Sequence, residues 1–303
     1  MVRVNKKNYI GAFIGMMVLA LASRSLIAGE KINKSLALEG ESSIKINYQR
    51  GNISVIGWDQ NKIQIKGELD DKAKHLELKK EGKTIRITIT LLEKDSYIAS
   101  GKSSKLTIRV PKELLVQITA VTGSINISEI NGGIVLSLDS GTLVAKKIKK
   151  SVNISSVGTN INLIDINATV DIDSVSGKII VKGQSSKLFV KSVYSNIDIA
   201  LNLITFCKIS NISGNINLRG PLANNGEISI SNSTGDTSYF ASDDLNARIW
   251  LETGPGGDIL NQFTKDKPTS GMVGDEKLIY SVGNSKGKIH MITQNGKLMV
   301  NRK

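Results

Sequence analysis

Few side chains in this sequence could carry nucleophilic, acid–base or metal chemistry. There are two histidines, His75 and His290, and one cysteine, Cys207. His75 lies in the charged stretch DDKAKHLELKK and His290 falls on an outward position of an expected strand, so the two are not expected to meet. Cys207 lies in the apolar run LITFCKI, which predicts a buried thiol, and a single cysteine excludes an internal disulfide. A histidine-based triad, a metal site or a cofactor site is therefore not predicted.

Neighbouring carboxylates are the remaining candidates for catalysis. They occur as Asp70 with Asp71, Asp171 with Asp173, and Asp243 with Asp244. Asp171 and Asp173 alternate within one expected strand and would both face outward, as catalytic carboxylates do on β-helix polysaccharide lyases and hydrolases. The residues one repeat away are Asn153, Ser155, Phe189 and Lys191, and they supply no obvious catalytic partner. Solubilising side chains on a wet sheet face are the simpler interpretation, so no catalytic residue is assigned.

The densest basic cluster is the segment KKIKK at residues 146–150. Its lysines form a candidate patch for an anionic ligand and are expected at a bend around Ile148: Lys146, Lys147, Lys149 and Lys150. The chain carries a net charge of +13 at pH 7, which favours anionic partners such as envelope phosphates or acidic polysaccharides. No aromatic residue interleaves with the lysines, which argues against stacking on single-stranded nucleic acid. The alternative is solvated lysine that keeps a strand-rich protein soluble.

These side chains would be positioned by an internal repeat. A small residue precedes each alternating apolar pair at intervals of 18, 18, 18, 18, 19 and 21 residues, as Gly123, Gly141, Thr159, Gly177, Ser195, Gly214 and Gly235. With the small residue as position 1, apolar residues favour positions 3, 5 and 8, then 12, 14 and 17. The spacing never settles to a helical period, and the bends are rich in Gly, Ser and Asn. Each unit therefore indicates strand, bend, strand, bend.

A unit of about 18 residues in two nine-residue halves predicts an all-β protein, a β-solenoid whose coils stack in register. Ile161, Ile179 and Ile197 should then lie above one another in one internal column. A calcium-binding β-roll needs Gly-Gly-x-Gly-x-Asp loops, and NGGIVLSLD at residues 131–139 lacks the later glycine. A left-handed triangular coil would place an apolar residue where Thr142 stands, so a two-sided coil is preferred.

The repeats are assigned to residues 119–241, with different patterns on either side. Residues 29–118 contain strand-like runs without the period, such as TIRITITL at 84–91, and predict a β-rich N-terminal cap of sandwich type over the open first coil. Residues 242–303 lose the period and regain the motif in KGKIHMITQNGKLMVN, which predicts closing strands and a loop.

Residues 1–28 have the pattern of a secretory signal peptide. Arg3, Lys6 and Lys7 precede an uncharged apolar stretch at 10–22, which is short for a membrane span of roughly 20 residues. Cleavage is expected after Ala22 or Ala28 and would give an extracytoplasmic protein, either periplasmic or secreted. In the alternative, an uncleaved leader anchors the chain at a membrane.

Several segments resemble one known family. GNISVIGWD at 51–59, the Val110-Pro111 pair, the repeated [ST]-G-x-[IL]-x-[VIL] units and NGKLMV at 295–300 are similar to the bacterial putative-adhesin family of β-strand-repeat proteins, a domain of unknown function. The resemblance covers nearly all of the chain after the leader. It implies an extracytoplasmic β-solenoid, and it brings no catalytic residues and no cofactor.

The sequence thus predicts an exported, non-enzymatic envelope protein with a binding, adhesin-like or structural role. Expected partners are anionic envelope polymers or another envelope protein, with no specific nucleic acid, no cofactor, and a membrane only if the leader stays uncleaved. Two alternatives remain open: a polysaccharide-acting enzyme on a β-helix scaffold, and a membrane-anchored envelope-stress or sensor component. The oligomeric state is left open.

Overall fold

The structure is a computed structural model that describes residues 29–92 and 102–302, so the expected leader at 1–28 lies outside the described residues. The described residues form strands and no helix, which confirms the predicted all-β class. In chain order the strands are β1 (Lys31–Ala37), β2 (Ser43–Trp58), β3 (Lys62–Glu68), β4 (Ala73–Glu81), β5 (Thr84–Leu91), β6 (Ser104–Pro111), β7 (Leu115–Ile130), β8 (Ile134–Ser185), β9 (Leu188–Ser213), β10 (Ile216–Arg219), β11 (Leu222–Thr234), β12 (Thr237–Ala241), β13 (Ala247–Asn261), β14 (Thr269–Ser270), β15 (Glu276–Val282) and β16 (Gly287–Arg302).

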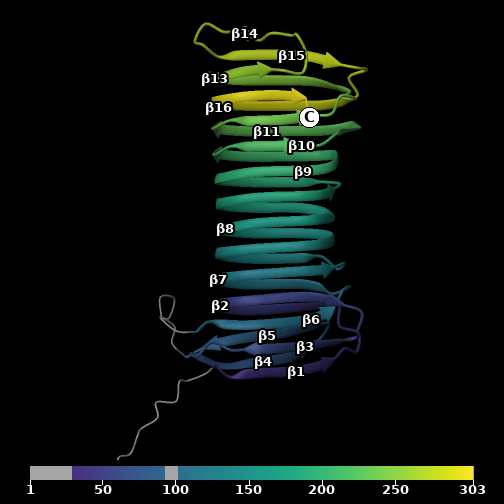
Figure 1. The fold of residues 1–303 in the computed structure, drawn as a ribbon, viewed down its shortest axis with the longest axis vertical. Coiled ribbons are helices and arrows are strands. Elements are labelled where there is room, and N and C mark those ends of the chain that lie inside the picture. The colour runs from purple at the N-terminus through teal and green to yellow at the C-terminus, as the bar shows by residue number, and fades with distance from the viewer. Residues whose placement is uncertain (1–28, 93–101, 303) are drawn as a thin grey trace, which may run out of the picture.

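The long central strands wind into a tall stack in which each turn of the chain pairs in parallel with the next (Figure 1). Strand β7 pairs with β8, placing Ile125 beside Leu143, and β8 pairs with β9, placing Ile179 beside Ile197. Within β8 the same offset recurs, because the Ser156 and Ser174 hydroxyls lie 2.9 Å apart across a separation of 18 residues. We call each such turn a coil.

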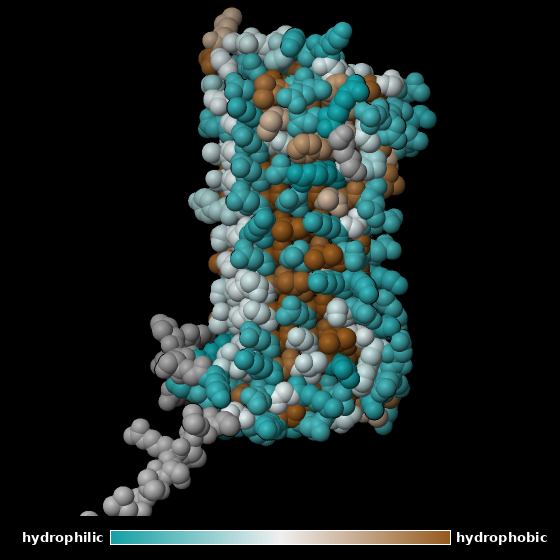
Figure 2. Space-filling model, viewed as in Figure 1, coloured by the Kyte–Doolittle hydropathy of each residue, from teal (hydrophilic) through white to brown (hydrophobic). Residues whose placement is uncertain are grey.

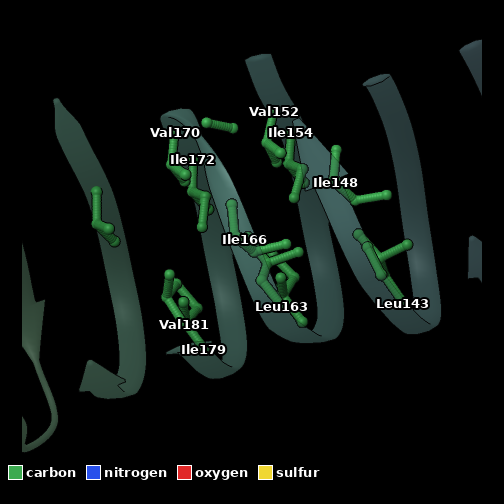
Figure 3. Close-up of a cluster of buried hydrophobic side chains, with 14 of the residues drawn as sticks. Leu143, Ile148, Val152, Ile154, Leu163, Ile166, Val170, Ile172, Ile179 and Val181 are labelled. Carbon is green, nitrogen blue, oxygen red and sulfur yellow. The ribbon is translucent and has the colours of Figure 1, made fainter. Parts of the chain in front are cut away.

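Apolar side chains from both sides of each coil fill its interior. In Figure 3, Val170 and Ile172 point toward Ile179 and Val181 across the space between the two strand segments of one coil. Equivalent residues of successive coils form a column in which no member is more than 1% exposed: Ile53, Ile125, Leu143, Ile161, Ile179, Ile197 and Ile216. Burial of each such side chain stabilises the fold by roughly 1.5–3 kcal/mol, which makes this column a main source of stability.

The column of small residues found in the sequence marks one sharp corner of the coils. Gly123 and Gly141 are register partners with φ of 139° and 130°. A Cβ atom at Gly141 would lie 1.9 Å from the carbonyl oxygen of Gly123 in the preceding coil. Both the backbone conformation and the close approach of the neighbouring coil therefore require glycine at this position.

A set of buried polar residues lies at the same corner, one from each of seven coils, and we call it the corner ladder. Asn232 is 1% exposed, and its Nδ2 donates to the carbonyl oxygens of Gly214 and Gly235 at 2.9 and 3.1 Å. Ser174, both asparagines and both threonines of the set donate hydrogen bonds to backbone carbonyls of the tight turn, while the other two serines pair with neighbouring serine hydroxyls. The members of the ladder are Ser156, Ser174, Ser192, Asn211, Asn232, Thr293 and Thr253.

At the N-terminal end the arrangement differs from the sandwich that the sequence favoured. Strand β2 lies on β7 with Ile53 beside Ile125, so it already belongs to the stack. Strands β5 and β6 pair in parallel with the other edge of β2, and β1, β3 and β4 add antiparallel strands beyond them. Residues 59–114, inserted between β2 and β7, hide this coil from a search for a fixed period. Strand β7 also runs across the boundary drawn at residues 118–119.

At the C-terminal end the order of the strands in space departs from their order in the chain. Strand β16 lies between two earlier parts of the stack (Figure 1): on one side Ile289 pairs with Ile228 of β11, and on the other with Ile249 of β13. Leu298 of β16 likewise lies between Thr237 of β12 and Ile259 of β13. Antiparallel strands β15 and β14 lie beyond β13.

The outside of the stack is not uniformly polar. On the face shown in Figure 2, a band of hydrophobic residues runs lengthwise between hydrophilic margins. Because side chains alternate between inside and outside along each strand, every outward position of a coil lies in line with its equivalents on the coils above and below. Outward features therefore extend along the stack.

Candidate functional site

The four lysines singled out in the sequence lie on a bend of β8, and we call them the lysine corner: Lys146, Lys147, Lys149 and Lys150. All four are exposed, while Ile148 between them is fully buried. Lys147 and Lys150 have φ of 55° and 68°, so the chain bends on either side of Ile148 and directs the lysines away from the interior. Lys147 Nζ lies 3.7 Å from Glu129 Oε1 of the neighbouring coil. The arrangement suits loose contact with a phosphate or carboxylate polymer.

The carboxylates proposed as an enzymatic alternative lie on the outer surface of β8, in the second half of the unit that begins at Thr159. Asp171 and Asp173 are both exposed, and their register partners on the next coil are Phe189 and Lys191, as the repeat predicts. Both line a hollow of about 380 Å³, together with Asn153 of the preceding coil. This geometry provides hydrogen-bond acceptors for a ligand. Catalysis would require a further group, and none is assigned.

A second hollow of about 450 Å³ adjoins the first and shares Asp171 with it. Its lining adds Phe189, Lys191, Lys208 and Ser210. We call the two hollows together the trough, with principal residues Asn153, Asp171, Asp173, Phe189, Lys191 and Lys208. Lys208 and the neighbouring Phe206 were not predicted from the sequence, because placing them beside Phe189 requires alignment across a 19-residue unit.

The histidines and the cysteine lie where the sequence placed them. His75 is exposed on β4, and His290 is half-buried on β16, with its ring centroid 5.3 Å from that of Trp250. Cys207 is fully buried, and burial raises the pKa of its thiol to about 12, so the thiolate is not formed near neutral pH. Within residues 29–92 and 102–302, no group of three or more His, Cys, Asp or Glu side chains is arranged to hold a metal ion.

The stacked parallel strands and their outward rows define an all-β protein built from repeated coils. A family model described as Toastrack DUF4097 matches residues 42–249, from the start of the stack into β13, and the chain belongs to this family of unknown function. The resemblance noted in the sequence is thereby confirmed.

The chain is also similar, at low sequence identity, to several solved structures. A putative lipid binding protein from Parabacteroides distasonis is 13% identical, with 89% of this chain and 97% of that chain covered and a TM-score of 0.46. A putative adhesin from Bacteroides fragilis is 14% identical over 89% and 97% of the two chains, with a TM-score of 0.42. A putative adhesin from Parabacteroides merdae is 10% identical over 90% and 96%, with a TM-score of 0.32.

No curated protein sequence matches the chain. In the part of the chain that the structure describes, no helix has the length and apolar character needed to cross a bilayer.

Proposed function

We propose that the protein is an exported β-solenoid of the cell envelope, periplasmic or secreted, with an N-terminal β-rich cap and a non-enzymatic role in binding anionic envelope polymers. The observation that carries the proposal is the lysine corner, in which four exposed ammonium groups are held on a bend of a stacked scaffold. The net charge of +13 attracts anionic polymers over longer distances. Exposed lysines bind phosphate or carboxylate with little geometric demand, which suits a repetitive polymer.

The experiment is a sedimentation assay with isolated cell-wall polymer and the purified chain lacking residues 1–28. Replacing Lys146, Lys147, Lys149 and Lys150 by Gln should weaken binding at least tenfold and flatten its dependence on salt, because fewer counterions are released. The matched control makes the same change at four exposed lysines near the other end of the stack: Lys265, Lys267, Lys286 and Lys288. Equal losses in the two variants would reduce the effect to net charge and overturn the lysine corner as the site.

A polysaccharide-acting enzyme is the second candidate, and the exposed pair Asp171 and Asp173 in a hollow favours it. Turnover of acidic polysaccharides that Asp171→Asn abolishes would establish the enzyme and replace the binding role. A third candidate, a membrane-anchored sensor, depends on the leader. N-terminal sequencing of the exported protein decides between them, since a first residue at Ser23 or Gly29 removes the anchor.

A further inference from the structure

The trough carries charges that have no partner among the residues that the structure describes. Asp173 and Lys191 are register partners on adjacent coils, yet in the described chain neither forms an ion pair or a hydrogen bond. The same holds there for Asp171 and Lys208. Elsewhere on the stack, neighbouring coils do close such pairs, as Arg219 Nη1 and Asp198 Oδ1 lie 2.6 Å apart. The trough therefore offers separate acceptors and donors to a ligand.

Between these charges lies an aromatic surface. Phe189 is 38% exposed and its ring centroid lies 5.2 Å from that of Phe206, with the rings tilted by 45°. A large apolar side chain beside Asp171, Lys191 and Lys208 gains little from its exposed part in the free protein. It provides a platform for the apolar face of a ring that also carries polar groups at its edge.

The spacing of the rows suits a chain-like ligand. Successive coils advance by about 4.8 Å, so Asn153, Asp171 and Phe189 present one side chain per coil along the stack axis. This step is close to the length of one sugar residue in an extended polysaccharide. A polysaccharide lying along the trough would meet first Asn153, then the two carboxylates, and then the phenylalanines and lysines, which lie side by side on the next two coils.

We infer that the trough binds an acidic polysaccharide, with one sugar ring on Phe189, sugar hydroxyls donating to Asp171 and Asp173, and an acidic substituent on Lys191 and Lys208. The inference rests on the proposed function and adds to it a site and a ligand class. Asp171 and Asp173 repel an acidic group on the sugar that they bind, so that sugar is neutral. The acidic sugar is the one that reaches the lysines, and the ligand therefore alternates acidic sugars with neutral ones. The lysine corner, by contrast, requires only negative charge.

The test is isothermal titration calorimetry with an oligosaccharide of alternating glucuronate and N-acetylglucosamine. Phe189→Ser should weaken binding about tenfold through loss of the ring platform. The double change Lys191→Gln with Lys208→Gln should weaken binding by at least as much and reduce its dependence on salt. Tyr194→Ser is the matched control, because Tyr194 is 62% exposed, lies five residues after Phe189 in β9, lines neither hollow of the trough, and should leave affinity unchanged.

The outcomes separate this inference from the function on which it rests. The inference fails if Phe189→Ser binds the oligosaccharide as wild type does, or if a neutral N-acetylglucosamine oligomer binds equally well. It also fails if the oligosaccharide does not bind while cell-wall polymer still sediments with the protein, and the proposed function then stands without the trough. A lysine-corner variant that loses the polymer but keeps the oligosaccharide supports two distinct sites. If the wild-type protein binds neither the cell-wall polymer nor the oligosaccharide, both proposals are overturned.

Discussion

Replacing Asn232 of the corner ladder by leucine, a side chain of similar volume, should lower the free energy of unfolding of the stack. The Asn232 Nδ2 is the donor to the carbonyl oxygens of Gly214 and Gly235, at 2.9 and 3.1 Å. Leucine has a similar volume but no donor, so both carbonyls would stay buried and lose this hydrogen bond. The second buried asparagine would also lose a contact, because the Asn211 Nδ2 lies 3.4 Å from the Asn232 Oδ1.

The magnitude follows from the two carbonyls. A buried polar group left without its partner costs about 1–3 kcal/mol, which gives a loss of about 2–6 kcal/mol for the pair. Burial of the leucine side chain returns up to about 1.5–3 kcal/mol. A net decrease of about 2 kcal/mol in the free energy of unfolding is therefore expected. Asn232→Thr should lose less, because a hydroxyl keeps one donor, as Thr293 does on the adjacent coil.

The assay is urea unfolding followed by circular dichroism, with the free energy taken from the midpoint and slope. Asn217→Leu is the matched control, because Asn217 is half-buried on the outer surface and forms no hydrogen bond through its side chain in the described chain. It should change stability by no more than about 0.5 kcal/mol. If Asn232→Leu proved as stable as Asn217→Leu, the ladder would not be needed to satisfy the turn, and the reasoning would be wrong.

Gly141, Asp70 and Cys207 are each buried or conformationally constrained, so each can be tested by substitution, acidification or labelling. Gly141→Ala should cost more than about 1 kcal/mol in urea unfolding, since its Cβ would lie 1.9 Å from the Gly123 carbonyl oxygen; a neutral result would contradict the close approach. Burial acts to raise the pKa of Asp70, but the hydrogen bonds from Arg50, 2.5 Å away, and from the Lys72 backbone N–H, together with the charge of Arg50, outweigh it and hold the pKa below its ordinary value. The stability from this pair is therefore present above about pH 4 and lost as the pH falls through the folded-state pKa, so wild type should lose more stability on acidification than Asp70→Asn. The thiol of Cys207 should react with a thiol reagent at pH 8 only in urea, because it is fully buried with a pKa of about 12; fast reaction of the folded protein would show the coil to be open.

The apolar column could be read from the sequence because its physical signal is periodic. Ile125, Leu143, Ile161 and Ile179 each face the interior, and the equivalent position is apolar in each unit of the chain as far as Ile216. The corner ladder could not be read in the same way. Serine and asparagine are also common at exposed bends, so Ser174 and Asn232 gave the same signal as solvent-facing turn residues. Only their distances to the turn carbonyls distinguish the two situations.

The order of the strands at the two ends of the stack and the residues of the trough could not be predicted from a fixed repeat length either. Pairing of β2 with β7 spans a long insertion, and pairing of β16 with β11 and β13 reverses the chain order. Any strand with matching apolar positions could pair at these ends, so the apolar pattern alone does not show which strands pair. The trough depends on Phe206 and Lys208 lying beside Phe189 of the preceding coil. A count of 18 residues from Phe189 does not reach Lys208, because this unit has 19 residues.

The position of β16 has a consequence for how this end of the molecule is assembled. Strand β13 is earlier in the chain, yet it makes no parallel pairing with β11 or β12 and rests on β16 instead. This end cannot form by adding coils in chain order, because β13 has no parallel partner strand until β16 has paired with β11 and β12. Deleting the 16 residues of β16 would therefore remove the strand between β13 and the pair β11 and β12, and would not simply shorten the stack by its last coil.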